Sequence, residues 1–68
     1  MQIDVRALRR AIAASGQTVA SLARDAGISQ IVINHWLKGE ARPRIDTLGK
    51  LARALNVDIY DLLEDEQP

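Results

Sequence analysis

The middle of the chain carries side chains whose types and spacing suit contact with a nucleic acid. On a helix with about 100° per residue, four of them share one face and the fifth stands at its N-terminal tip. The four are Ile31, Asn34, His35 and Lys38, and the fifth is Gln30. A glutamine can bond adenine N6 and N7 together, a histidine can donate to guanine, and isoleucine methyls suit the thymine methyl. On a helix that meets DNA, Gln30, Ile31, Asn34 and His35 would read bases, and Lys38 would contact phosphate.

The same face has other interpretations. Gln30 and Asn34 could be ordinary solvated residues, and His35 could simply pack beside Trp36. Ile31 could belong to a protein interface instead of reading a base. The residue types alone leave these alternatives open.

Three β-branched residues in a row, Ile31, Val32 and Ile33, also favour a buried strand. On a helix, however, they would not share a face, because Ile33 turns inward with Trp36 while Ile31 turns outward and Val32 lies at the rim. Helical patterns precede and follow this run. We therefore predict a helix here.

The chain offers little for catalysis or metal binding. It has no cysteine and a single histidine, so it lacks a thiol nucleophile and the ligand set of a zinc site. The sequence contains no nucleophile–base set and no glycine-rich phosphate loop. We expect no enzyme, no cofactor and no metal.

The 68 residues suffice for one small domain. No apolar run approaches the roughly 18–20 residues of a membrane span, and the N-terminal sequence MQIDVRALRR lacks the apolar core of a signal peptide. These features predict a soluble, cytoplasmic protein without membrane contact.

Charge is unevenly distributed along the chain. The formal net charge is zero, but residues 58–66 hold five acids and no base, whereas residues 1–57 hold all nine lysines and arginines. A basic body of this kind attracts polyanions by neutralising phosphates, although basic helix faces can also simply be solvated.

Hydrophobic spacing and capping residues predict an all-α domain of five short helices. Candidate N-caps and stop residues delimit helices at about 4–15, 19–26, 29–38, 45–55 and 58–63. Very few residues separate the second predicted helix from the third. A helix-turn-helix is indicated by small Ala23, where the helices cross, and by a turn at Gly27. The angle between the helices would be filled by Ile28, Ile33 and Trp36.

These residues resemble a known family. The stretch TVASLARDAGISQIVINHWLKG, residues 18–39, is similar to the helix-turn-helix of the XRE family, of Cro and phage-repressor type. The likeness continues through ARPRIDTLGKLARALNVDIYDLL and covers about residues 5–63. It implies a five-helix lambda-repressor-like fold and sequence-specific binding of double-stranded DNA, usually as a dimer on a two-fold-related operator.

Two departures from the family pattern matter. Val19 replaces a glutamine that helps to hold a phosphate in many members, which leaves the helix N-terminus to offer its amides. Ile12 and Leu37 stand where many members have a buried arginine–glutamate pair, so we predict an aliphatic contact between them.

Phosphate contacts are expected from two helix starts, from the end of the third helix and from the loop around Pro43. The residues are Thr18, Val19, Ser29, Lys38, Arg42 and Arg44. Proline stiffens the loop, and Arg44 is our candidate for the minor groove. Arg44 stands where many relatives have a capping serine, which arginine cannot replace. Two solvated arginines remain the alternative.

A homodimer is expected to form through the end of the fourth helix and the fifth helix. Its candidate residues are Leu55, Val57, Ile59 and Tyr60. The DNA-binding domain would span 1–63, and 64–68 would be an acidic tail or the start of a linker. The alternative function is an antitoxin or protein-interaction module, whose partner could be a toxin or antirepressor.

Overall fold

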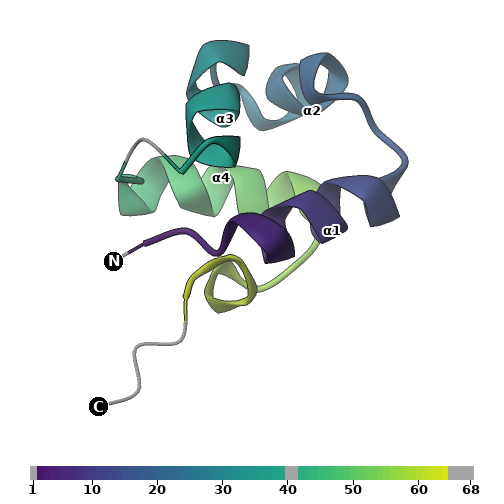
Figure 1. Ribbon diagram of the computed structural model, residues 1–68. Helices are drawn as coiled ribbons and strands as arrows, with labels where there is room; N and C mark the ends of the chain where they lie inside the picture. Colours follow the sequence, from purple (N-terminus) through teal and green to yellow (C-terminus); the bar gives the residue numbers. More distant parts are fainter. Residues whose placement is uncertain (1, 40–41, 65–68) are drawn as a thin grey trace.

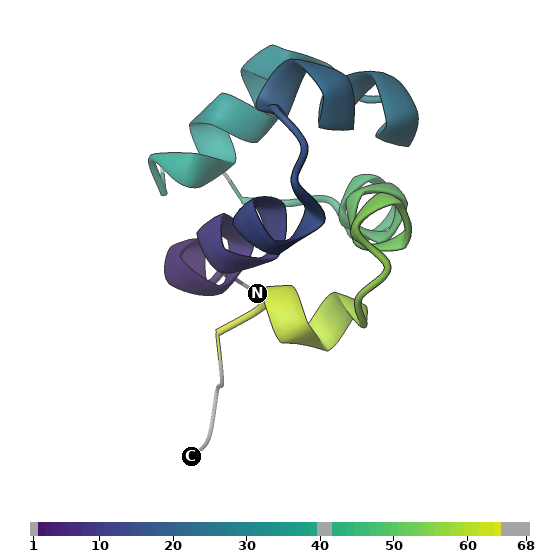
Figure 2. The ribbon, with the colours of Figure 1, turned by 90° about the vertical axis from the view of Figure 1, so that its right-hand side faces the viewer.

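The computed structural model describes residues 2–39 and 42–64, and these are largely helical. The described chain forms four α-helices and one 3₁₀ turn, α1 (Val5–Ser15), α2 (Val19–Ala26), α3 (Gln30–Leu37), α4 (Ile45–Leu55) and η1 (Ile59–Leu62). Figures 1 and 2 show three tiers, with α2 and α3 above, α1 and α4 in the middle, and η1 below.

Local capping explains where the first three helices begin. The amide of Ala7 donates to Asp4 Oδ1 at 3.1 Å, that of Ser21 to Thr18 Oγ1 at 3.0 Å, and that of Ile31 to Ser29 Oγ at 3.1 Å. Each bond satisfies an amide that the first helical turn leaves unpaired. The predicted bounds of these helices, and those of α4, agree with the structure to within one residue.

The structure corrects the prediction of a fifth α-helix over 58–63. Only Ile59–Leu62 is helical, and it is a 3₁₀ turn rather than an α-helix. Asp58 and Asp61 form a capping box at its start. Asp61 Oδ2 accepts from the Asp58 amide at 3.3 Å, and Asp58 Oδ1 accepts from the Tyr60 amide at 2.9 Å. Leu63 then becomes extended, at φ −107° and ψ 150°, because its backbone pairs elsewhere. The turn therefore ends after four residues.

Residues 2–4 and 62–64 pair beside η1, which the sequence did not predict. Ile3 and Leu63 form an isolated antiparallel bridge. The amide of Asp4 donates to the Leu62 carbonyl, and that of Glu64 to the Gln2 carbonyl, both at 2.9 Å. Ile3 is buried there.

One aliphatic core holds the helices together. Its largest fully buried side chains come from all four α-helices and from η1, and they are Leu8, Leu22, Ile33, Leu48, Leu51 and Leu62. Trp36 is 2% exposed. Ile12 is buried, and Leu37 packs against the same core. Both positions are compatible with the predicted contact between the two side chains, and the contact itself stays a prediction.

Candidate nucleic-acid interface

A three-residue turn sets the angle between α2 and α3. Gly27 has φ +72°, and its amide donates to the carbonyls of Ala23 and Arg24. The amide of Ile28 also donates to the Ala23 carbonyl, at 3.0 Å. A positive φ favours glycine, because a side chain would be strained there. Together with buried Ala23, this turn lets α3 pack across α2 and stand at the edge of the fold (Figure 1).

The two sides of α3 separate as the sequence predicted. Ile33 is fully buried and Trp36 is 2% exposed, so they anchor the helix in the core. The opposite side is open to solvent, and Ile31 is 66% exposed. All of the predicted reading and terminal residues lie on it, namely Gln30, Ile31, Asn34, His35 and Lys38. An outward face with amide, imidazole, methyl and ammonium groups can contact base edges and phosphates.

A shallow hollow of about 250 Å³ brings one predicted base reader together with the loop arginines. It lies between the second half of α3 and the start of α4, and its lining includes His35, Arg42 and Arg44. Val32, Trp36 and Thr47 supply the rest of the lining. Cationic groups around a largely apolar floor suit a sugar–phosphate backbone. Thr47 was not among the predicted site residues, although its place in the first turn after the arginines is visible in the sequence.

The N-termini of α2 and α3 can bind phosphate while their capping hydrogen bonds stay in place. Thr18 and Ser29 are exposed, and each hydroxyl oxygen accepts from an amide of its own helix. Each hydroxyl hydrogen is then available to donate outward. The side chain of Val19 is half-buried against the core. Its backbone amide, in the first turn, has no intrahelical acceptor.

A contact from α1 holds the far end of α3. The Arg9 Nη2 donates to the Leu37 carbonyl at 3.3 Å. A guanidinium at a helix C-terminus meets unpaired carbonyls and the negative end of the helix dipole. Arg9 therefore helps to position the exposed face, a role that the sequence analysis did not assign to it. No local motif reveals this contact, because 28 residues separate the two partners.

Three of the four predicted dimer residues are at least partly exposed to solvent. Tyr60 is 76% exposed, and Val57 and Ile59 are half-buried at the edge of the core. Leu55 is only 7% exposed and belongs to the core. An interface here would consist of the other three, with Leu55 supporting them from beneath. We call Val57, Ile59 and Tyr60 the η1 patch.

Over the described ranges 2–39 and 42–64, no group of three or more histidines, cysteines or acids could hold a metal ion. In the same ranges no helix is both long and apolar enough to cross a membrane.

The family comparison agrees with this geometry. The family model of the Cro/C1-type HTH DNA-binding domain matches residues 7–68, which include all four α-helices except the first two residues of α1. A comparison with curated proteins gives no match.

Proposed function

Because the chain belongs to the family of Cro/C1-type helix-turn-helix DNA-binding domains, we propose that it is a sequence-specific regulator of transcription, and most simply a repressor. The observation that carries the proposal is the solvent-facing side of α3, where five residues able to contact DNA lie opposite a buried anchor. In this motif the second helix enters the major groove. A repressor then acts by occupying its site.

Specificity and affinity would come from different residues. Gln30, Ile31, Asn34 and His35 would read base edges by hydrogen bonds and methyl contact. Phosphate attraction would come from Lys38, from the two helix starts and from Arg42 and Arg44 beside the hollow, with Arg44 also within reach of the minor groove. Arg44 Nε lies 3.6 Å from Asp46 Oδ1, but both side chains are exposed, so this weak pair would not prevent contact with DNA.

A homodimer on a two-fold operator would extend the site. The η1 patch supports this part of the proposal, because an exposed tyrosine beside two half-buried aliphatic residues is a surface that self-association would cover. A symmetric pair of domains would read two half-sites related by the same two-fold axis.

In vitro selection of bound sequences from random duplex DNA tests the proposal. We expect one enriched site with two-fold symmetry, and an affinity that falls steeply as salt rises, since phosphate neutralisation releases counterions. Two exposed positions provide matched variants. Ile31→Glu places a carboxylate against the groove and should abolish enrichment, whereas Tyr60→Glu should keep the half-site and lose the symmetry.

Two results would contradict the proposal. Failure to enrich any site at moderate salt would favour the protein-interaction alternative, in which Ile31 and Val32 contact a protein partner and binding is insensitive to salt. If the Ile31→Glu variant enriched the same site as strongly as the unchanged chain, α3 would not be the DNA-contacting helix.

A further inference from the structure

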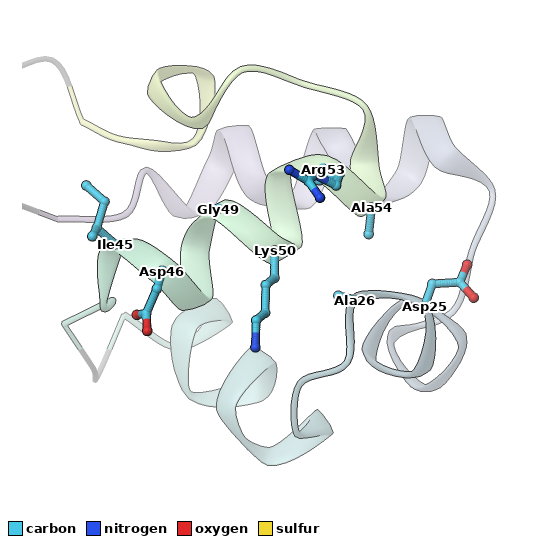
Figure 3. A pocket seen from close by; sticks show the side chains of 8 residues that line it. All are labelled: Asp25, Ala26, Ile45, Asp46, Gly49, Lys50, Arg53 and Ala54. Atoms are coloured by element: carbon cyan, nitrogen blue, oxygen red, sulfur yellow. The ribbon is translucent and has the colours of Figure 1, made fainter.

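A second surface lies along α4, and none of the residues that line it comes from α3. An open groove of about 520 Å³ runs along α4 to the end of α2. Figure 3 shows its lining, which comes from α4 and from the end of α2. The lining residues are Asp25, Ala26, Ile45, Asp46, Gly49, Lys50, Arg53 and Ala54. Ile45 is 59% exposed, which is unusual for so large an apolar side chain.

Gly49 at the middle of this groove is not required by the fold. Glycine inside a helix is unfavourable because it loses the most conformational freedom on folding. At other glycines of this chain a positive φ explains the choice, but Gly49 is an ordinary helical residue. A Cβ built on it would meet nothing within 4 Å. The space above Gly49 is therefore free for a group from outside the chain.

The charges along the groove are self-complementary. Asp46 and Arg53 lie at equal distances on either side of a point between Gly49 and Lys50. If a second α4 crosses antiparallel at that point, Asp46 of each copy lies opposite Arg53 of the other, and each is about 5 Å along the axis from the crossing. The long Lys50 side chain of one copy can lie over Gly49 of the other.

We propose that the α4 groove is a self-association surface, in which two copies pack α4 against α4 about a two-fold axis. Every contact in such an interface occurs twice, so one Asp46–Arg53 pairing provides two ion pairs. Ile45 and Ala54 add apolar surface at the ends of the contact. An unrelated partner would not require opposite charges at equal distances from the point between Gly49 and Lys50.

The α4 groove is distinct from the η1 patch, since the two share no residue. Two different two-fold surfaces on one chain allow dimers to join further, for instance side by side on neighbouring DNA sites. A contact too weak to matter for the free chain can then act, because DNA raises the effective concentration of neighbours. The inference itself rests on the groove and does not require the DNA-binding proposal.

Amide NMR spectra of the full chain at increasing concentration test the α4 surface. The Tyr60→Glu background removes association through the η1 patch. We expect concentration-dependent shifts of the amides of 25–26 and 45–54 up to about 1 mM, the range of a weak complex. Shifts that do not change over that range would overturn the proposal.

Substitution of Gly49 gives a test whose two effects have opposite signs. Gly49→Gln should raise the melting temperature of the chain, because glutamine favours helix, and should weaken self-association about tenfold or more by filling the groove. Ala14→Gln on exposed α1 is the matched control and should leave association unchanged. Unweakened association of a stably folded Gly49→Gln chain would overturn the proposal.

Charge reversal identifies the register. Asp46→Arg and Arg53→Asp should each weaken association about tenfold, since each creates two like-charge contacts. The double variant should restore it, because the pairs form again with their signs exchanged. Arg6→Asp, which makes on α1 the same charge change as Arg53→Asp, should have no effect. Failure of the double variant to recover association, with its helices intact by circular dichroism, would reject this register and the proposal with it.

Discussion

At the residue scale, the exposed face of α3 is unusual because it contains no arginine. Arginine is the commonest partner of guanine, so the proposed base contacts must rely on an amide, an imidazole and methyl groups. Cationic charge instead lies at the edges, on Lys38 at the end of α3 and on Arg42 and Arg44 beside the hollow that His35 also lines. Base recognition and phosphate attraction are therefore separable by single substitutions.

Gln30→Ala and Lys38→Ala should weaken DNA binding in different ways. Loss of the Gln30 amide should cost about 1–3 kcal/mol on the preferred site and relax the preference at one base step. Loss of the Lys38 ammonium should weaken all sequences alike and reduce the slope of log affinity against log salt by about one phosphate contact. Titrations of the selected site and of a scrambled duplex at several salt concentrations measure both effects.

Equal relaxation of sequence preference by the two variants would contradict this division between base reading and phosphate contact. Gln17→Ala serves as a control, since Gln17 lies before α2 and is not among the proposed contacts.

The sequence was informative about which side chains of α3 face outward, because helical periodicity fixes that once Ile33 and Trp36 are assigned to the core. It could not reveal that Arg9 contacts the Leu37 carbonyl, nor that Leu55 is buried in the core. Both depend on how α1 and η1 pack against the other helices, which no local pattern encodes.

At the element scale, α4 begins without the help that the other α-helices receive. Its N-cap residue is Arg44, and no side-chain hydrogen bond caps the helix. The carboxylate of Asp46 accepts from the Thr47 amide at 2.9 Å and compensates in part. An arginine at this position costs stability, and its place beside the hollow offers a functional reason for that cost.

Arg44→Ser should make the domain more stable and bind DNA less well. A serine can cap the first turn of α4 and should add about 0.5–1 kcal/mol to the free energy of unfolding. Removal of the guanidinium should lower DNA affinity and its salt dependence. Urea denaturation and DNA titration measure the two effects on the same preparation. Lower stability, or unchanged affinity, would count against our account of Arg44.

The four α-helices were predictable because their limits are set by nearby residues. Asp4, Thr18 and Ser29 cap within their own first turns, and Asn56 ends α4 at φ 58°. The 3₁₀ turn and the Ile3–Leu63 bridge were not predictable in the same way. A single bridged pair leaves no alternating pattern, and the length of η1 depends on where Leu63 must pair.

At the scale of the whole molecule, the lower tier closes the core. Leu62 is 1% exposed and Ile3 is 7% exposed, so both ends of the chain contribute buried apolar surface. A 68-residue domain has little core to spare. The bridge therefore matters more for stability than its two hydrogen bonds alone suggest.

Leu62→Ala should cost about 2–4 kcal/mol of the free energy of unfolding, because it removes a fully buried side chain and leaves a cavity. At roughly 0.05–0.15 kcal/mol per residue, a domain of this length has only a few kcal/mol in total. Thermal and urea denaturation should show a large loss of stability. Tyr60→Ala, two residues earlier and exposed, should change it little, and a similar loss in both would refute the role given to Leu62.

The antiparallel bridge also determines how the domain responds to mechanical force. Gln2 pairs with Glu64 at the outer end of the bridge, and Asp4 pairs with Leu62 at its inner end. A pull on the chain before Gln2 and after Glu64 therefore acts at the same end of the bridge. Tension between the two termini would load the Glu64–Gln2 hydrogen bond first and the Asp4–Leu62 bond only after it breaks. The pair would open like a zipper at low force, and Ile3 would leave the core before any α-helix is pulled apart.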